Sequence, residues 1–211
     1  MSQELQNYIL LNELAEQIYA NGQRVAVVLE GRDSAGKSST IRKLTKYLPP
    51  YTFRVQHSFK PNKSTMKNWL PSWAKKMPRQ GEIVFYDRSW YSRALLQPVM
   101  GWCSQVAYEN FMGSVTDWED SQNITFIKLW LSISEVEQEK RLNNRKRDPL
   151  RYWKFSSNDP VALSKFDMIT IYKERMLTET NGWNVLDYND KKTGKEEALQ
   201  LLTNTLERTM I

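Results

Sequence analysis

Apolar positions along the chain follow two patterns, one with the period of a helix and one typical of buried strands. Residues 3–20 carry apolar side chains at helical spacing and therefore predict an amphipathic helix, which Asn21-Gly22 ends. Residues 24–30 form a nearly continuous apolar, β-branched run, which is typical of a parallel strand buried on both faces. The apolar face of the N-terminal helix consists of Leu10, Leu11, Leu14 and Ile18.

The rest of the chain repeats this alternation. Four further strands are predicted at residues 52–57, 82–87, 124–131 and 183–188. Helices are predicted at 36–48, which Pro49-Pro50 ends, around 104–120, at 134–147, at 159–179 and after Gly194, where Leu199, Leu202 and Leu206 share a face. Alternating strands and helices imply βαβ units, so we expect an α/β three-layer sandwich with a parallel five-stranded sheet between helices. Since neither a repeat nor a long linker divides the chain, residues 1–211 are expected to form a single domain.

A phosphate-binding loop follows the first predicted strand. The run from Gly31 to Ser38, Gly-Arg-Asp-Ser-Ala-Gly-Lys-Ser, matches the pattern G-x-x-x-x-G-K-[ST] and opens a helix, as this kind of loop requires. Gly31 and Gly36 let the backbone fold around phosphate oxygens, toward which successive N–H groups point. Lys37 would place its charge on the β- and γ-phosphates, and Ser38 would offer a hydroxyl to Mg²⁺. The other candidate phosphate-binding residues of the loop are Ser34, Ala35 and Ser39.

Two acidic residues are candidates for handling a metal. Asp33 lies inside the loop, where a carboxylate would repel phosphate unless a cation intervened. It either ligates Mg²⁺, activates the acceptor oxygen or stabilises the loop by accepting backbone N–H bonds. Asp87 ends the predicted strand 82–87, which suits a metal ligand, with an N-cap or turn role as the alternative, and Arg88 would clamp a phosphate. We therefore expect Mg²⁺, or Mn²⁺ in its place, with Asp33, Ser38 and Asp87 as ligands.

The net charge of +6 is concentrated in two clusters. Residues 60–79 contain six Lys or Arg and no acid, and residues 140–154 contain seven Lys or Arg and one acid. Focused positive charge concentrates phosphate-bearing ligands, so a polyanionic partner is expected, with solvated helix faces as the alternative. Lys60 and Lys63 of the first cluster are candidate phosphate ligands, and so is Arg93, for which a surface role is an equal alternative.

The second basic cluster predicts a helical lid over residues 138–156. Arg141 and Arg145 are one helical turn apart and share a face, so they could close together over a transferring phosphoryl group and act as catalytic cations. The alternative for each of them is again a solvated helix.

Several features exclude other classes of protein. Cys103 is the only cysteine, so no intrachain disulfide forms, and it is expected to be a buried thiol without a basic partner. His57 is the only histidine, which excludes a zinc site and favours a core or polar-edge position. The longest apolar run, residues 25–29, is too short to span a bilayer, and the N-terminus has no export signal. A cytoplasmic protein without a membrane partner is expected.

Three sequence blocks resemble the family-2 polyphosphate kinases, which are relatives of thymidylate kinases. They are Glu-Gly-Arg-Asp-Ser-Ala-Gly-Lys at 30–37, Gly-Glu-Ile-Val-Phe-Tyr-Asp-Arg-Ser-Trp-Tyr-Ser-Arg at 81–93 and Asp-Pro-Leu-Arg-Tyr-Trp-Lys-Phe-Ser at 148–156. Residues 99–103 and 189–192 support the resemblance, which covers about residues 25–192 in collinear order.

The resemblance implies a P-loop NTPase fold with a lid, and Mg²⁺-dependent transfer of a phosphoryl group between inorganic polyphosphate and a nucleoside mono- or diphosphate. The expected nucleotide is of the ADP, GDP or AMP class, and the expected assembly is a homodimer or homotetramer. By motif, the resemblance assigns the chemistry to Asp33, Lys37, Asp87 and Arg88, with lid arginines near Arg141 and Arg145.

The chain also departs from the family pattern, and the departures leave the substrates open. The family loop usually ends Gly-Lys-Gly-Gly, whereas this one ends Gly-Lys-Ser-Ser; residues 60–67 lack the expected acid, and Ser72 stands where an arginine is expected. An ATP-dependent nucleoside or nucleotide kinase is therefore the alternative. A nucleic-acid-binding ATPase, with Trp69 and Trp73 stacking on bases, is not expected, because their spacing favours a helix face packed on the core.

Overall fold

A computed structural model describes residues 1–58, 60–149 and 163–210 of the chain. Within these ranges five strands form one sheet in the order β2-β3-β1-β4-β5, and every neighbouring pair is parallel. The strands are β1 (Arg24–Gly31), β2 (Phe53–His57), β3 (Glu82–Asp87), β4 (Thr125–Ser132) and β5 (Trp183–Asp187). The predicted five-stranded parallel sheet is therefore confirmed, with strand ends within one residue of the expected ones.

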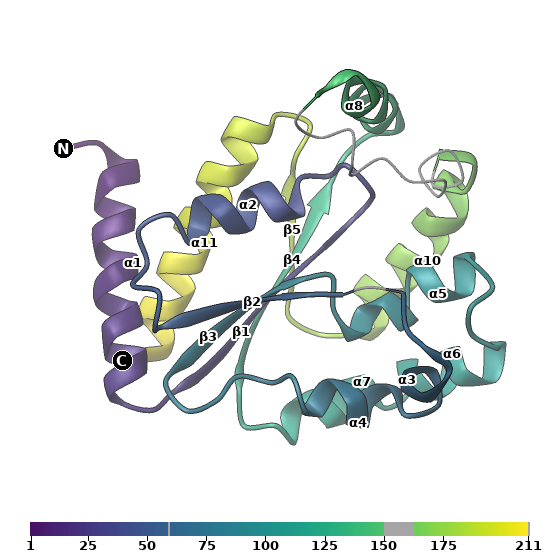
Figure 1. The fold of residues 1–211 in the computed structure, drawn as a ribbon, viewed down its shortest axis with the longest axis horizontal. Helices are drawn as coiled ribbons and strands as arrows, with labels where there is room; N and C mark the ends of the chain where they lie inside the picture. Colours follow the sequence, from purple (N-terminus) through teal and green to yellow (C-terminus); the bar gives the residue numbers. More distant parts are fainter. Residues whose placement is uncertain (59, 150–162, 211) are drawn as a thin grey trace.

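Helices cover both faces of the sheet (Figure 1). One face carries α1 (Gln3–Ala20), α2 (Lys37–Leu44) and α11 (Lys191–Met210), and the other carries α4 (Trp69–Ala74), α6 (Gln105–Met112), α7 (Val115–Asp120) and α10 (Phe166–Glu179). Two apolar clusters fill the spaces between the layers, and β1 contributes alternate residues to them. Val25, Val27 and Leu29 enter one cluster, and Ala26 and Val28 enter the other. Burial on both faces explains the continuous apolar run and confirms the three-layer prediction.

The remaining elements are short or lie at the ends of the strands. They are α3 (Lys63–Lys67), the 3₁₀ helix η1 (Trp90–Arg93), α5 (Leu96–Val99) and α8 (Glu135–Arg147). Trp69 and Trp73 of α4 are 7% and 1% exposed, so they pack on the core as their spacing predicts and cannot stack on bases. No helix in the described part of the chain is long and apolar enough to cross a membrane.

Four predicted helices have different bounds. The helix predicted at 159–179 is α10, which begins at Phe166, and residues 159–162 lie outside the described part of the chain. The segment 104–120 is two helices, because α6 ends at Met112 and Gly113 caps it before α7 begins. The helix predicted to reach residue 48 ends at Leu44, and turns follow it. The last helix begins at Lys191 rather than after Gly194, since the side chain of Asp190 accepts a hydrogen bond from the N–H of Thr193 over 2.7 Å and so caps an earlier start.

Candidate active site

The phosphate loop connects β1 to α2 at the carboxyl edge of the sheet. Gly31 has φ +152°, and a Cβ there would lie 2.7 Å from the carbonyl oxygen of Leu131, so only glycine fits beside β4. Ser34 and Gly36 also have positive φ, of +64° and +119°. These left-handed residues curl the backbone between Gly31 and Lys37, where α2 begins, as the motif requires.

Lys37 is folded into its own loop. Its side chain is buried, and its ammonium donates hydrogen bonds to the carbonyl oxygens of Gly31 at 2.8 Å and Arg32 at 2.9 Å. Burial, together with the positive charge of Arg88, lowers the pKa of Lys37 to about 8. The cation is therefore held at the centre of the loop, where the motif predicts that it meets phosphate oxygens.

Ser38 and Asp87 meet where the loop faces the end of β3. The Ser38 hydroxyl donates to Oδ2 of Asp87 over 2.5 Å, and Nδ1 of His57 lies 3.6 Å from the same oxygen. His57 lies at the exposed end of β2. Of the two positions expected for it, core or polar edge, the polar edge is therefore confirmed. The predicted metal ligands Ser38 and Asp87 thus lie together. The alternative of an N-cap or turn role for Asp87 is wrong, because Asp87 is the last residue of β3 and Ser89 caps the 3₁₀ helix that follows.

The donor set here suits a hard cation that keeps water and substrate ligands. In the described ranges no three His, Cys, Asp or Glu side chains gather into a metal-binding group. Mg²⁺ is commonly held by one or two protein oxygens plus phosphate oxygens and water, so a hydroxyl and a carboxylate beside a phosphate loop fit it. Ser38 and Asp87 could hold such an ion, and Asp33 of the same loop is the third candidate.

Asp33 and Arg88 form an ion pair across the mouth of the loop, in which the guanidinium donates to Oδ1 of Asp33. Burial opposes ionisation of Asp33, but the charges of Arg88, Lys37 and Arg145 outweigh it and hold the pKa of this carboxyl below its usual value. The predicted partners of Asp33 were a metal, an acceptor oxygen or backbone N–H groups. The structure adds a partner that the sequence did not suggest, and this partner is itself a predicted phosphate ligand.

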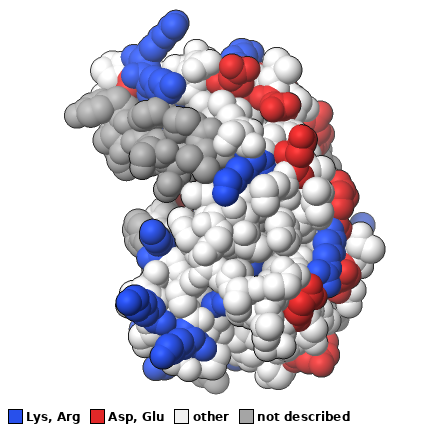
Figure 2. All heavy atoms as spheres, turned by 90° about the vertical axis from the view of Figure 1, so that its right-hand side faces the viewer, with Lys and Arg blue, Asp and Glu red and all other residues white. Residues whose placement is uncertain are grey.

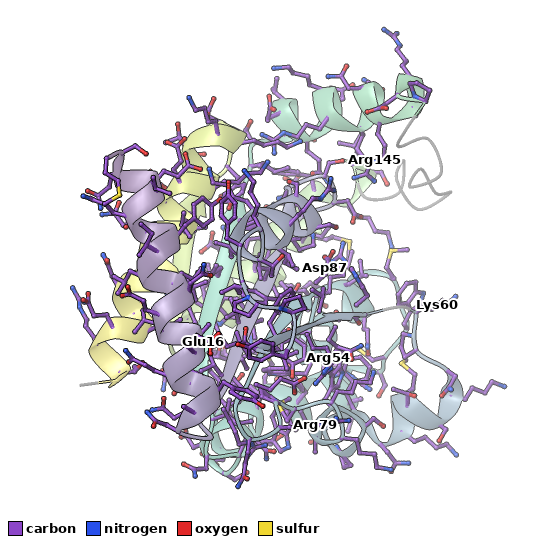
Figure 3. All side chains as sticks on the ribbon, turned by 60° about the vertical axis from the view of Figure 1, so that its left-hand side comes forward. Glu16, Arg54, Lys60, Arg79, Asp87 and Arg145 are labelled. Atoms are coloured by element: carbon purple, nitrogen blue, oxygen red, sulfur yellow. The ribbon has the colours of Figure 1, made fainter. Side chains whose placement is uncertain are left out.

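Helix α8 lies over the loop and brings both predicted lid arginines to it (Figures 1 and 3). Arg145 donates to the hydroxyl of Ser34 over 2.6 Å. Arg141 is buried, and its guanidinium donates to carbonyl oxygens on both sides: to Ala35 at 3.0 Å and Asn189 at 3.1 Å, with further bonds to Ser34 and Tyr188. Arg141 therefore fixes the loop to the end of β5, and the solvated-helix alternative is wrong for it. Residues 150–156 of the predicted lid, and of the third sequence block, lie outside the described residues.

Comparison with known proteins identifies the family to which this arrangement belongs. The family model described as "Polyphosphate kinase 2 (PPK2)" matches residues 1–211, the whole chain. The chain belongs to the polyphosphate kinase 2 family. The resemblance inferred from the three sequence blocks is thereby confirmed.

Proteins named polyphosphate phosphotransferases match over most of this chain. ADP-polyphosphate phosphotransferase 1 of Rhizobium meliloti is 37% identical over 89% of it, and NDP-polyphosphate phosphotransferase 3 of Ruegeria pomeroyi is 34% identical over 94%. The chain spans 65% and 69% of the length of these two relatives. The crystal structure of polyphosphate kinase 2 from Arthrobacter aurescens superposes with a TM-score of 0.91 at 26% identity, covering 99% of this chain and 78% of that one. The predicted P-loop kinase fold is thus confirmed.

Other predicted phosphate ligands of this polyphosphate kinase 2 chain lie outside the loop. Arg93 is buried, not at the surface: Nη2 donates to the carbonyl oxygen of Met66 over 2.7 Å. Lys60 places its ammonium 4.9 Å from the ring centre of Trp102, and Lys63 is exposed at the start of α3. Figure 3 shows Lys60 on the coil after β2, to one side of Asp87. Arg93 therefore lies on η1, Lys60 on the coil after β2 and Lys63 on α3, all outside the loop itself.

Cys103 corrects two expectations. The thiol is half-buried rather than buried, and Arg93 interacts with it, so the prediction that Cys103 lacks a basic partner is wrong. Burial nevertheless raises the pKa of the Cys103 thiol against the opposing effect of Arg93. The conclusion that this cysteine is not activated therefore remains, for a different physical reason.

Two buried charged residues next to the loop were not singled out as site residues from the sequence. Arg32 donates to the carbonyl oxygen of Phe166 over 2.9 Å and stacks 3.4 Å from that ring's centre, tying the loop to α10. Burial lowers the pKa of Arg32 to about 10. Glu30 is fully buried in β1 and accepts hydrogen bonds from the N–H and hydroxyl of Ser89. An acid that directly follows the apolar run 25–29 could have drawn attention to Glu30, whereas the distant partner of Arg32 left no local signal.

Proposed function

We propose that the chain catalyses Mg²⁺-dependent phosphoryl transfer between inorganic polyphosphate and a nucleoside mono- or diphosphate. The observation that carries the proposal is that the whole chain belongs to the polyphosphate kinase 2 family, with relatives named ADP- and NDP-polyphosphate phosphotransferases. A buried lysine in a phosphate loop, beside an acidic strand end and an arginine, supports it physically. The activity, substrates and partners proposed below rest on these two supports.

The transfer is proposed to be direct and in line. A terminal phosphate oxygen of the nucleotide attacks the terminal phosphorus of the polyphosphate, the bond from that phosphorus to its bridging oxygen breaks, and a polyphosphate one unit shorter leaves. Phosphoryl transfer passes through a loose transition state, so positioning and charge neutralisation supply most of the catalysis. A bound Mg²⁺ would neutralise phosphate oxygens. A phosphorylated enzyme trapped with donor alone would contradict the direct route.

Each residue of the site has a proposed part in this transfer. Lys37 would exchange the carbonyl oxygens of its own loop for phosphate oxygens, and Arg88 would stabilise the charge that develops on the transferred group. Asp33, Ser38 and Asp87 would hold the metal. Arg145, which reaches the loop from α8, would add positive charge next to the phosphates bound there.

The distribution of surface charge supports a long polyanion as the donor. Figure 2 shows Lys and Arg gathered along one margin of the molecule, in an upper group over α8 and a lower group over α3 and α4, whereas most Asp and Glu lie along the opposite margin. The exposed basic residues of these segments include Lys60, Lys63, Lys67, Lys75, Lys146 and Arg147. A chain of phosphates longer than one nucleotide needs positive charge beyond the loop, which a nucleotide donor does not.

Product analysis tests the proposal. Purified protein is incubated with Mg²⁺, long-chain polyphosphate and AMP, ADP, GMP or GDP in separate reactions, and the nucleotides are separated. We expect ATP or GTP to form from a diphosphate, or a diphosphate from a monophosphate, and this product to vanish in Lys37→Ala. Transfer from ATP alone would favour the alternative, a nucleotide kinase that does not use polyphosphate.

A pair of charge variants separates the two donors. Lys63→Glu/Lys67→Glu changes the lower basic group, and Lys192→Glu/Arg208→Glu makes the same change of charge on α11. For a polyphosphate enzyme we expect the first variant to raise the KM for long polyphosphate far more than the KM for the nucleotide, and the second to change neither. Equal effects of the two variants would speak against a polyphosphate path over α3.

Assembly and location are proposed with the function. A homo-oligomer, dimer or tetramer, is proposed from the family resemblance, and light scattering of the eluting protein tests it. A cytoplasmic location is supported by the single cysteine, which leaves no intrachain disulfide to form. Fractionation of cells that produce the protein, followed by immunoblotting, tests that location.

A further inference from the structure

Glu30 is the acidic residue of the site to which the proposed mechanism gives no part. It is the penultimate residue of β1 and 0% exposed. Its Oε1 accepts two hydrogen bonds from Ser89, one from the backbone N–H at 2.7 Å and one from the hydroxyl at 2.8 Å. Burying a carboxylate this deeply costs free energy. We therefore expect Glu30 to hold other groups of the site in place.

What Glu30 holds is the turn that carries Arg88. Arg88 has φ +65°, a left-handed conformation that is unfavourable for a bulky side chain. Its own N–H donates to the carbonyl oxygen of Leu29 over 3.2 Å, and the next residue, Ser89, is fixed by Glu30. Strained backbone persists only where its surroundings determine it, and here β1 supplies both fixed points through consecutive residues, Leu29 and Glu30.

The carboxyl group of Glu30 also interacts electrostatically with Arg88. Oε2 is buried and has no hydrogen-bond partner. Burial raises the pKa of this carboxyl, and the positive charge of Arg88 is the largest of the effects that oppose the rise; Glu30 in turn favours the charged form of Arg88. Arg88 therefore interacts with two acidic residues: its guanidinium donates to Asp33, and the nearby Glu30 favours its charged form.

We propose that Glu30 is a positioning residue for Arg88, holding its backbone through Ser89 and keeping its guanidinium in the site when Asp33 turns to metal or substrate. The inference rests on the proposed function, in which Asp33 and Arg88 both face the transferred group. Asp33 cannot at once ligate a cation and keep its full attraction for Arg88. Glu30 is fully buried, so no substrate displaces it from its two hydrogen bonds with Ser89 beneath the turn.

Glu30→Gln tests this role, since it keeps the size of the side chain and one acceptor oxygen but removes the charge. We expect kcat to fall by about a hundredfold, the effect of a small misplacement of a catalytic group, with little change in KM for the nucleotide. We expect no loss of Tm, because a buried carboxylate is costly and its neutral analogue is not. If Glu30 only stabilised the fold, Glu30→Gln would instead lower Tm and leave kcat unchanged at temperatures below that Tm.

Two matched variants complete the experiment. Ser89→Ala removes one of the two hydrogen bonds and leaves the charge, so it should lower kcat less than Glu30→Gln does. Glu82→Gln neutralises an acid at the opposite end of β3, where Glu82 pairs with Arg54 at 2.9 Å, and should leave kcat unchanged. A Glu30→Gln protein with wild-type kcat would overturn the proposal, as would a Glu82→Gln protein with an equal loss.

A crystal structure of Glu30→Gln keeps this test independent of the proposed function. If the wild-type protein transferred no phosphoryl group from any donor, the proposed function would fail, yet Arg88 could still be examined directly. We expect Arg88 in the variant to leave the left-handed region or to lose its ion pair with Asp33. An unchanged turn and an unchanged pair would overturn the inference. Should Glu30→Gln not fold, Glu30→Asp, with a shorter side chain of the same charge, is examined in the same way.

Discussion

The hydroxyl of Ser38 lies 2.5 Å from Oδ2 of Asp87, and this hydrogen bond joins the phosphate loop to the end of β3. The two residues are far apart in sequence but meet because β1 and β3 are neighbours, with Leu29 opposite Asp87 in the register. Carboxyl ends of parallel strands are where open α/β sheets bind ligands. One hydroxyl and one carboxylate therefore come together where the phosphates of a substrate would lie.

Asp87→Asn is expected to lower kcat by roughly two to three orders of magnitude and to raise the Mg²⁺ concentration needed for half-maximal rate. The amide keeps the shape of the side chain but loses the charge that attracts a cation. Ser38→Ala should shift the Mg²⁺ requirement less, because a hydroxyl is a weaker ligand. Rates measured over a Mg²⁺ titration check both variants, with Asp117→Asn on the surface of α7 as the control. An unshifted Mg²⁺ requirement in Asp87→Asn would remove this residue from the metal site.

Lys37→Ala is expected to lower the rate of transfer by roughly two to three orders of magnitude, the size of effect found for well-placed electrostatic groups. Lys37→Arg should recover little, because a planar guanidinium does not fit a buried pocket formed by the carbonyls of Gly31 and Arg32. Single-turnover measurements separate transfer from product release. Lys46→Ala, an exposed residue just after α2, serves as the control. If Lys37→Ala retained near-normal turnover, the loop would not bind the transferred phosphate.

Substitutions of the two arginines of α8 are expected to affect different properties, stability for Arg141 and kcat for Arg145. Arg141→Ala leaves buried carbonyl oxygens without donors, so the free energy of unfolding should fall by roughly 2–4 kcal/mol. Arg145→Ala should lower kcat more than it lowers stability, because its charge acts on Asp33 and its guanidinium contacts Ser34 at the loop. Urea denaturation and steady-state kinetics of both variants check this split. Equal losses of stability would mean that both arginines are structural.

The sheet was predictable because each strand carries its own local signal. The apolar run of β1 and the acid that ends β3 place both strands correctly, and turn residues separate them from the helices. Helix ends were less predictable, since they depend on single caps. Asp190 starts α11 before Gly194, and Gly113 divides the segment 104–120, although neither effect appears in the spacing of apolar residues.

The candidate site was predictable as far as its motifs are contiguous. The loop and the Asp87-Arg88 pair each lie in one short segment, so the sequence shows both, and the parallel sheet brings them together. The side-chain partners were not predictable. Arg32 contacts Phe166, which is 134 positions away in the sequence, and Arg141 contacts Ala35, which is 106 positions away. Such pairs follow from tertiary packing, which local spacing does not encode.

The ion pair between Arg175 and Glu109 predicts how stability depends on pH. Arg175, on α10, donates to both carboxylate oxygens of Glu109, on α6, at 2.8 and 2.7 Å. These hydrogen bonds hold the pKa of Glu109 below its usual 4.5. A carboxyl with a lowered folded-state pKa stabilises the fold above its unfolded-state pKa, and this stabilisation is lost as the pH falls through the folded-state value.

Arg175→Gln should therefore have a lower Tm than the wild-type protein at pH 7, and the difference should shrink as the pH falls below about 4.5, because protonated Glu109 no longer attracts the guanidinium. Because the pair is exposed to solvent, added salt should also reduce the difference at pH 7. Thermal unfolding followed by circular dichroism over a pH series measures it. Arg208→Gln, at the end of α11, removes the same charge elsewhere and should show no such dependence on pH. A Tm difference for Arg175→Gln that stayed constant into acid would mean that the arginine stabilises the fold by packing rather than by its pair with Glu109.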